Sequence, residues 1–584
     1  MNNLTTEFDF IDSDASLEET KPTLTNDQFR FIESFIEWFS NASTSHLMTL
    51  SGAAGCGKTF VSTDAIKYAL NNGAKRIGVC APTKTAVAVL TEKLQDAGLN
   101  VSKNVWDLQK RSEDCKAGNG IFVGTLHQFI SARPELGDDP EAENLDFIPQ
   151  HVLENQPIAS VDLLIVDEAS MITSSFFKHL KEASELLQLK ILFMGDQFQL
   201  FPIEKNPQIS KAFSDVPLLV EMNTIVRYSG DILKEATQIR ELMEFGVNVK
   251  AYSFKSYNQP DFVTYRNHHT FLDGAWMEAI IAKVKEQKEK RLPLNFFRVV
   301  TFRRKTMEQL NQKIREILYG DAAIDSYFTG ENFFTHGQCS NFIPMETRLE
   351  TSVNRYRHGT KSNLVLARLA NSRDYNAIQA RQIETQLPDP SVYTTCSFDF
   401  PHLVQAVNLV TFKVFDYNAQ DWLEYEYAIL SPSQLAQHSY NAEQIEAALL
   451  PVLDTLDHKI AHSSHKSLGY SDAVTDRAIL ADYLRMFNYC YNVDTEVVYN
   501  SSSGSTDEAV RTTKENGKIV KRKSLCKLQP GYAITTHKAQ GNTYNHVFVL
   551  YQDFFASREL DTMYRLIYTA LTRASESVHM FTKY

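Results

Sequence analysis

Cysteine is scarce in this 584-residue chain, and none of it is arranged in close pairs. The seven cysteines are odd in number, lie far apart and form no CxxC pair. This argues against a disulfide framework, which needs paired cysteines, and against a zinc ribbon, which needs closely spaced ligands. The sequence therefore predicts a protein of a reducing compartment, the cytoplasm.

Long hydrophobic runs and a basic leader are also missing. No apolar stretch approaches the roughly 18 residues that a membrane span needs. Residues 1–20 hold six acidic residues and no Lys or Arg, unlike a signal or transit peptide. We expect an acidic, disordered tail over residues 1–22 and no contact with a membrane.

The remaining composition is that of an ordinary globular protein, with 43% hydrophobic and 22% charged residues. At about 150 residues per domain, the length predicts roughly four domains. Lys and Arg number 59 and Asp and Glu number 71, so the net charge is −12. This balance argues against bulk attraction to nucleic acid. Because half of the excess lies in the six acids of residues 1–20, a local basic groove is still compatible with the sequence.

Short apolar runs alternate with helical patterns from residue 25 onward. We expect strands over 46–51, 76–81, 161–168 and 190–196, and a helix over 58–70. A second set follows, with strands over 296–302, 531–536, 546–551 and 577–581 and helices over 305–318 and 563–574. Strands that are apolar throughout are typical of a parallel sheet covered on both faces. The pattern predicts two α/β domains.

The second predicted domain is interrupted by a long insertion. Within it, runs 409–417 and 423–430 alternate between apolar and polar residues, which indicates antiparallel β structure. The segment 441–490 is rich in helical pattern. The fold class is therefore α/β with a large mixed insertion in the second domain.

The segment GAAGCGKT (52–59) fits the P-loop pattern G-x-x-x-x-G-K-[ST] between a predicted strand and a predicted helix. Backbone N–H groups of the turn would hold phosphate oxygens. Lys58 would reach the β- and γ-phosphates, and Thr59 would bind Mg²⁺. A chance match in a tight turn is the alternative, which the strand–loop–helix context disfavours. The candidate nucleotide-binding residues are Gly52, Gly55, Cys56, Gly57, Lys58 and Thr59.

Two further segments at predicted strand ends carry polar groups suited to nucleotide hydrolysis. In LLIVDEAS (163–170), Asp167 suits a Mg²⁺ contact and Glu168 suits the base that polarises the attacking water. A solvated loop is the alternative for this pair. In GDQFQLFPI (195–203), Gln199 is a neutral donor that could sense a γ-phosphate, or a polar turn residue. Gln28 could hydrogen-bond an adenine edge.

Arg227 in IVRYS and Arg573 in YTALTRA are candidate arginine fingers. An arginine supplied to the transition state of phosphoryl transfer contributes about 10³–10⁵ in rate. If both face one nucleotide between two domains, hydrolysis is coupled to closure of the cleft, as in a motor. Each arginine taken alone fits a surface ion pair better than a finger.

Taken together, the motifs resemble those of superfamily 1 helicases of the RecD/Dda branch, and most closely helicases of the Dda type from T-even bacteriophages. The ten motifs, in family order, are LTNDQF, GAAGCGKT, APTKTA, TLHQF, VDEAS, GDQFQLFPI, IVRYS, FRRKTMEQLN, TTHKAQG and YTALTRA. The resemblance implies two RecA-like P-loop motor domains with ATP and Mg²⁺ as cofactors. It also implies a DNA helicase that moves 5′→3′ on single strands.

The resemblance assigns DNA-contacting roles to residues whose own chemistry does not reveal them. It places Pro82, Thr83, Thr125 and His127 of the first domain, and Thr536, His537 and Lys538 of the second, at loops that touch the strand. Gln540 and Gly541 would link the last of these loops to the nucleotide. Short polar groups on loops can hold phosphates without reading bases.

The family also splits duplexes with a hairpin inserted after TLHQF, and residues 131–158 fit that insertion. Phe147 is the candidate wedge on which a base would stack, a contact worth about 1–3 kcal/mol. The alternative is that Phe147 plugs the base of the hairpin. The family carries an SH3-like β part within the second domain, which we expect inside 331–525, and residues 431–490 would be an added helical element.

A basic cluster precedes the TTHKAQG loop. Residues 511–527 contain seven Lys or Arg and one Glu. We expect Lys521, Arg522 and Lys523 to bind DNA phosphates, with a solvated loop as the alternative. His458, His462 and His465 share one face of a possible helix, but no Cys or acid completes a metal set, so we expect surface residues.

These expectations divide the chain into an acidic tail (1–22), a first motor domain (23–221), a second motor domain (222–330 and 526–584) and an inserted domain (331–525). The expected partners are single-stranded and forked DNA, with a single-stranded-DNA-binding protein or a replisome component as further candidates. We expect a monomer in the cytoplasm, that of the host if the source is a phage.

Several other functions are compatible with the same motifs. They are an RNA helicase, a translocase that does not unwind, and a motor subunit of a recombination or exonuclease complex. A P-loop kinase is a more distant alternative, because it would need no second α/β domain.

Overall fold

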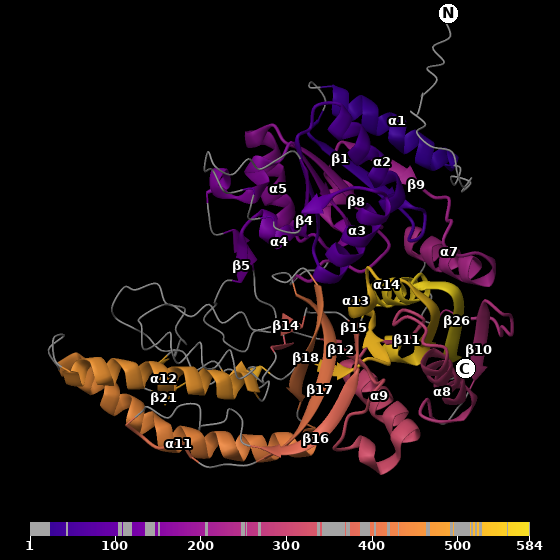
Figure 1. Cartoon of the computed structure of the whole chain (residues 1–584). Coiled ribbons are helices and arrows are strands. Elements are labelled where there is room, and N and C mark those ends of the chain that lie inside the picture. Colours follow the sequence, from indigo (N-terminus) through magenta and orange to yellow (C-terminus); the bar gives the residue numbers. More distant parts are fainter. Residues whose placement is uncertain are drawn as a thin grey trace, which may run out of the picture.

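The computed structural model describes most of the chain (Figure 1). The described residues are 24–41, 45–102, 105, 108, 120–134, 147–149, 152–204, 208–246, 252, 254–266, 270–335, 339–340, 368–369, 374–385, 397–401, 405–416, 421–429, 431–462, 468–490, 494–495, 514–515, 518–519, 523–524, 528–557 and 559–582. Two α/β parts lie one above the other in the view, and a part with two long helices extends to the lower left.

The first part is built on a seven-stranded, fully parallel sheet with the order β3-β4-β2-β7-β8-β1-β9. Its strands are β1 (Leu47–Gly52), β2 (Arg76–Ala81), β3 (Val101–Ser102), β4 (Gly120–Thr125), β7 (Leu163–Val166), β8 (Lys190–Gly195) and β9 (Leu218–Met222). Parallel strands end at the same edge of a sheet, so the loops after β1, β7 and β8 meet there.

Helices cover both faces of this sheet. One face carries α1 (Asn26–Ser40), α2 (Lys58–Asn71) and α3 (Lys84–Asp96), and the other carries α4 (Leu126–Phe129), α5 (Ser174–Leu187) and α6 (Lys211–Ser214). Strand β8 serves both cores, because Leu192 and Met194 pack toward the first set while Ile191 and Phe193 pack toward the second. This period-2 alternation within an entirely apolar strand is what a doubly covered sheet requires.

The second part has a five-stranded, fully parallel sheet with the order β10-β26-β25-β11-β24. Its strands are β10 (Phe262–Arg266), β11 (Phe297–Thr301), β24 (Ala533–Thr535), β25 (Tyr544–Leu550) and β26 (Ala574–Thr582). One core holds α7 (Gly230–Glu244), α13 (Thr536–Ala539) and α14 (Leu560–Leu571), and the other holds α8 (Gly274–Glu289) and α9 (Arg304–Tyr319). The first of these cores also contains Phe198 and Leu200 from the loop after β8, so the two parts share buried surface.

The insertion between β11 and β24 is built from antiparallel strands and two long helices. Strands β12 (Asn332–Thr335), β15 (Asp374–Asn376) and β23 (Leu528–Pro530) form one small sheet, and β16 (Gln379–Thr385), β17 (Gln405–Asp416) and β18 (Asp421–Ile429) form another. Helices α11 (Pro432–His462) and α12 (Leu468–Cys490) pack along each other and project away from the rest (Figure 1).

The predicted fold class is confirmed: the chain has two RecA-like α/β domains with parallel sheets. Most predicted strands lie within two residues of the observed ones, but β10 was not predicted and the first long helix begins at Pro432 rather than near residue 441. Strands β5 (Ala132–Pro134) and β6 (Phe147–Pro149) pair antiparallel inside the proposed hairpin insertion. The wedge, the SH3-like assignment and the domain boundaries stay predictions. No helix among the described residues is long and apolar enough to cross a membrane.

Candidate active site

The P-loop connects β1 to α2 and needs glycine at two positions. Gly55 and Gly57 have φ angles of 89° and 90°, in the left-handed region that glycine adopts without strain. A Cβ on Gly57 would lie 2.5 Å from Nε2 of Gln28, and one on Gly55 would lie 2.7 Å from Cβ of Arg227. Neighbouring groups therefore approach the loop more closely than any other residue would allow.

Lys58 and Gln28 hold this loop from two sides. Lys58 Nζ donates hydrogen bonds to the carbonyl oxygens of Gly52 (2.7 Å) and Ala53 (3.1 Å), which places the ammonium over the turn. Gln28 Nε2 donates to the carbonyl of Cys56 (3.0 Å), while its Oε1 accepts from the backbone N–H of Thr25 (3.0 Å). Gln28 thus caps α1 and anchors the P-loop, a structural task that its predicted contact with adenine did not include.

The acidic pair lies directly after β7, where Glu168 adopts a left-handed φ of 53°. Asp167 Oδ1 accepts a hydrogen bond from the backbone N–H of Glu168 (2.9 Å). Burial and the adjacent Glu168 carboxylate raise the pKa of Asp167 to about 6, although Lys58 and Lys93 act in the opposite direction. A divalent cation would relieve both causes, because it neutralises a carboxylate that is costly to ionise in this setting. The donor set of Asp167 and Thr59 therefore fits Mg²⁺.

Gln199 lies close to a residue of the second domain at the same edge. Gln540 Nε2 lies 3.3 Å from Oε1 of Gln199, 3.3 Å from Oγ of Ser170 and 3.4 Å from Oε2 of Glu168. Of these four side chains only Glu168 carries a formal charge, and the other three are neutral polar groups. Gln540 of the second domain is therefore within hydrogen-bonding distance of the Glu168 carboxylate of the first.

The two candidate arginine fingers both reach the interface between the domains. Arg227 follows β9, its backbone N–H donates to the carbonyl of Gly55 (3.1 Å), and its Nη1 donates to the carbonyl of Thr572 (3.4 Å). Arg573 is 3% exposed and donates from Nε to the carbonyl of Thr569 (3.1 Å). Burial, followed by the charge of Arg573, lowers the pKa of Arg227. Two enclosed cations in one cleft create a site that favours an anion.

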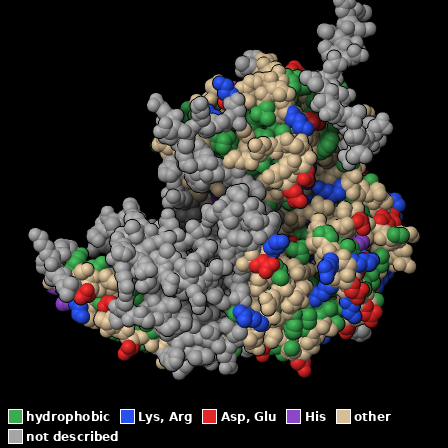
Figure 2. All heavy atoms as spheres, viewed as in Figure 1, with side chains coloured by type: hydrophobic (Ala, Val, Ile, Leu, Met, Phe, Trp, Pro, Cys, Tyr) green, Lys and Arg blue, Asp and Glu red, His purple; other side chains and the backbone are tan. Residues whose placement is uncertain are grey.

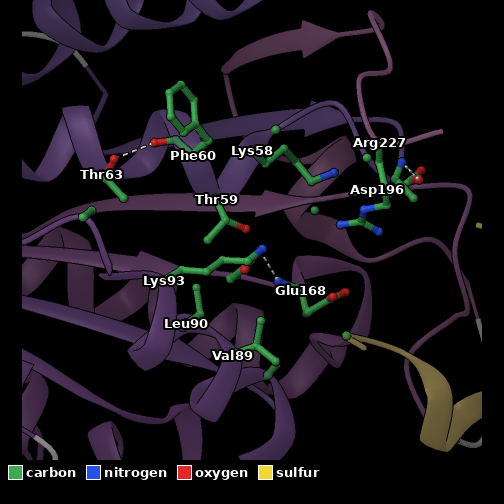
Figure 3. Close-up of a pocket in the computed structure, with 18 of the residues that line it drawn as sticks. Lys58, Thr59, Phe60, Thr63, Val89, Leu90, Lys93, Glu168, Asp196 and Arg227 are labelled. Atoms are coloured by element: carbon green, nitrogen blue, oxygen red, sulfur yellow. Dashed lines mark hydrogen bonds between the residues drawn. The ribbon is translucent and has the colours of Figure 1, made fainter. Parts of the chain in front are cut away.

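These groups line one cavity of about 930 Å³ between the domains. Figure 3 shows Lys58, Thr59, Glu168, Asp196 and Arg227 arranged around it. Gln199, Gly541 and Arg573 also line it, whereas Gln28, Gly52 and Cys56 are not among its lining residues, so most predicted nucleotide-site residues of both domains meet in one space. Cys56 is fully buried, and its carbonyl accepts the hydrogen bond from Gln28.

Four residues of this region were missed by the sequence analysis. Lys93 lines the cavity from α3. Asp196 Oδ2 accepts hydrogen bonds from the Ala54 N–H (2.8 Å) and from the Tyr568 hydroxyl (2.8 Å). Arg565 Nη1 donates to the Gln199 carbonyl (2.9 Å) and to the Gln197 carbonyl, with its guanidinium 4.0 Å from the Phe201 ring centroid. The helical periodicity of α14 could have indicated that Arg565 and Tyr568 share a face, but not what that face meets.

Lys93 lies in a strongly charged setting. Enclosure by the walls of the cleft lowers the pKa of Lys93, and so do the cations Arg227 and Lys58, while Asp167 and Glu168 act in the opposite direction. The residue nevertheless stays open to solvent, because it lines a cleft rather than a core.

Several residues that were predicted to contact the DNA strand stabilise local structure. Thr83 accepts from the Ala86 N–H (3.2 Å) as the N-cap of α3, and Thr125 is the N-cap of α4. His127 packs its ring edge-on against Phe176, with centroids 5.0 Å apart, and burial lowers its pKa. Thr536 is fully buried and donates to the Thr301 carbonyl (3.0 Å). The remaining three, Pro82, His537 and Lys538, lie at the starts of α3 and α13.

Other predicted contacts fall where side chains are not described. Lys521 and Arg522 lie outside the described residues, and the side chains of Lys523 and Phe147 are likewise not described. His458 and His462 stack with ring centroids 4.0 Å apart, and His465 lies outside the described residues. On the face shown in Figure 2, the blue and red side chains of the described residues are interspersed.

Two family models match the chain in the order of its two domains. Residues 24–264 match an AAA domain model, and residues 530–581 match a model of the UvrD-like helicase C-terminal domain. The RecD subunit of the RecBCD enzyme of Buchnera aphidicola is 28% identical over 213 residues, which are 36% of this chain and 31% of RecD. These matches support an ATP-hydrolysing helicase that is similar to superfamily 1 helicases of the RecD type. As a helicase with this AAA domain it binds nucleotide and hydrolyses ATP.

Other proteins are similar to this helicase over most of its length. An uncharacterized protein of Acanthamoeba polyphaga mimivirus is 20% identical over 553 residues, covering 92% of this chain and 96% of that protein. Among solved structures, the Pif1 helicase from Bacteroides with ADP-AlF3 and single-stranded DNA is 12% identical, with a TM-score of 0.41, covering 96% of this chain and 92% of that one. Pif1 from Candida albicans is 14% identical with a TM-score of 0.39, covering 96% and 95%.

Proposed function

We propose that this helicase is an ATP-dependent DNA helicase of the Dda type that moves 5′→3′ on single strands and unwinds duplexes in replication, recombination or repair. The observation that carries the proposal is the convergence on one cavity of a P-loop and an acidic pair from the first domain with two arginines, Arg227 and Arg573, from the second. Such a site is emptied and filled as the domains open and close. The similarity to RecD supports DNA as the nucleic acid along which the protein moves.

Within this proposal each residue of the cavity has one task. Lys58 binds the β- and γ-phosphates, Glu168 polarises the attacking water, and Arg227 and Arg573 stabilise charge at the transferred phosphoryl group. Gln199 reports the presence of the γ-phosphate to Gln540 across the interface. Thr59 and Asp167 would hold Mg²⁺, which when bound neutralises phosphate charge.

The DNA-contacting loops of the first domain and the loop of the second domain would bind the DNA strand in alternation. The loops at the starts of α3 and α4 form the DNA contact of the first domain, and the loop at the start of α13 forms that of the second. Closing the cleft between the domains would shorten the distance between these two DNA contacts. We keep 23–221 and 222–330 plus 526–584 as the proposed motor domains, with a wedge hairpin at 131–158 and an inserted domain at 331–525. The proposed form is a monomer acting on single-stranded and forked DNA.

A strand-displacement assay tests this function. Duplexes with a 5′ tail, a 3′ tail or no tail are offered as DNA and as RNA, with ATP and Mg²⁺. We expect unwinding of the 5′-tailed DNA only and single-stranded-DNA-stimulated ATPase that is lost in Lys58→Ala. Unwinding from 3′ tails would overturn the polarity, and unwinding of RNA alone would overturn the substrate.

The same assay separates unwinding from translocation. DNA-stimulated ATPase without any strand displacement would replace the proposal with a translocase or a motor subunit of a larger complex. ATP hydrolysis by Lys58→Ala at the wild-type rate would overturn the site itself.

A further inference from the structure

One wall of the nucleotide cavity is a single face of α3. Ala86, Val89, Leu90, Lys93 and Asp96 line the cavity at helical spacings of three and four, so they share this face. The first three are apolar or small, and Lys93 is the cation of this set. Figure 3 shows Val89 and Leu90 beside Lys93, whose side chain extends along the wall toward Glu168.

The ammonium of Lys93 lies within the influence of the charged groups that would surround a bound phosphate. The charges of Asp167, Glu168 and Lys58 all act on it, so it belongs to the same electrostatic group as the P-loop lysine and the acidic pair. Lys58 is folded back onto the carbonyls of Gly52 and Ala53 and approaches the cavity from the opposite side. A triphosphate whose terminal group lay between Lys58 and Lys93 would have a lysine on each side of that group.

We propose that Lys93 contacts the terminal phosphate of the bound nucleotide and is a further binding residue of this active site. The inference rests on the proposed ATP-dependent function and extends it. The flexible ammonium of Lys93, which lines the cavity together with Lys58 and Arg227, can form a charge-assisted hydrogen bond with a phosphate oxygen. A diphosphate is one phosphoryl group shorter and would leave Lys93 without this partner.

The position of Lys93 gives the contact a mechanical consequence. Helix α3 begins at the N-cap Thr83, which belongs to the proposed DNA-contacting loop, and Lys93 lies ten residues later in the same helix. At 1.5 Å per residue the two ends are about 15 Å apart on one rigid element. A displacement of Lys93 caused by contact with the terminal phosphate would thus move α3 and the DNA-contacting loop at its start. This coupling within the first domain would act in addition to any effect of domain closure.

The test compares nucleotides that differ in the terminal phosphate. The dissociation constants of ATPγS and ADP are measured with Mg²⁺ for the full chain and for Lys93→Met, which keeps the apolar stem but removes the charge. We expect about tenfold weaker binding of ATPγS and a change within about twofold for ADP. Lys93→Arg should recover most of the ATPγS affinity. Lys178→Ala, at an exposed lysine of α5, is the matched control and should change neither constant.

Two outcomes would overturn the inference. Unchanged affinity for ATPγS in Lys93→Met would show that the side chain does not reach the terminal phosphate. Equal losses for ATPγS and ADP would show a general role in shaping the cavity. Either result leaves the helicase proposal standing, because that proposal fails only if the wild-type protein lacks DNA-stimulated ATPase and strand displacement.

Discussion

Glu168 is the residue on which the proposed chemistry depends most. It lies beside Asp167 at the end of β7 and faces the cavity (Figure 3). Glu168→Gln keeps the shape but cannot accept a proton, so we expect ATP hydrolysis to fall by about 10²–10⁴-fold while nucleotide binding changes little. Steady-state ATPase and nucleotide titration measure the two effects. Glu182→Gln, at an exposed position of α5, is the control. Retained hydrolysis in Glu168→Gln would assign the base elsewhere.

Arg315 of α9 and Glu331, directly before β12, form a buried ion pair. Their Nε and Oε1 atoms are 2.5 Å apart, and their side chains are 5% and 0% exposed. Burial raises the pKa of Glu331 and Arg315 lowers it. Because Glu331→Gln leaves a buried guanidinium without its counter-charge, we expect the free energy of unfolding to fall by about 3 kcal/mol. Urea denaturation measures this loss.

An exposed ion pair on α9 is the control for that loss. Arg304 and Glu308 lie 3.0 Å apart on α9 with exposed side chains. Glu308→Gln should change the free energy of unfolding by less than about 0.5 kcal/mol. Similar losses in Glu331→Gln and Glu308→Gln would contradict the assignment of a structural role to the buried pair.

At the scale of elements, strands β10, β25 and β26 are joined by a chain of polar side chains. Ser577 Oγ lies 2.8 Å from Nδ1 of His546 and 3.0 Å from Nε2 of His579, and the Tyr265 hydroxyl lies 3.2 Å from Nδ1 of His579. Burial, then the charges of His546 and Lys283, lowers the pKa of His579 to about 4. The folded protein therefore favours the neutral imidazole.

This depressed pKa predicts a pH dependence of stability. The unfolded chain binds more protons between pH 6.5 and 4, so the stabilisation is present above pH 6.5 and is lost as the pH falls toward 4. The total is on the order of 1–3 kcal/mol. Thermal unfolding as a function of pH measures it. His579→Phe can still stack on Phe548 and should flatten the curve in this range. Identical slopes in both proteins would contradict the prediction.

At the scale of the whole molecule, the loop after β8 acts as a joint between the domains. Phe198 and Leu200 are buried in the core of the second domain, and Arg565 holds two carbonyls of the same loop. Arg565→Gln shortens the side chain and leaves these carbonyls unsatisfied. We expect a more open cleft, seen as a larger radius of gyration by small-angle scattering, and an ATPase rate at least tenfold lower.

A matched exposed arginine keeps that experiment specific. Arg304→Gln on α9 should change neither the radius of gyration nor the ATPase rate, because Arg304 lies outside the interface. Wild-type values for Arg565→Gln would show that the apolar contacts of the loop suffice to hold the domains together.

Much of the fold was predictable because parallel strands that are buried on both faces are apolar throughout. Strand β2 was predicted at its observed bounds, and the P-loop, Asp167 and Glu168 follow from local pattern. Strand β10 was missed, since its sequence FVTYR has no continuous apolar run. The hydrogen bonds of Thr83 and Thr125 to helix starts were equally hidden, because an N-cap and a phosphate contact use the same short polar side chain.

The sequence by itself determined the chemistry of the nucleotide site, since phosphate binding and water activation need particular groups at fixed local spacings. Only the tertiary structure decided which distant residues join them. Lys93, Arg565 and Tyr568 carry no local pattern that distinguishes them from surface residues, and their tasks depend on what lies opposite. The scarcity of cysteine excluded disulfide and zinc frameworks, and what holds the domains together instead is a loop of the first domain buried in the core of the second.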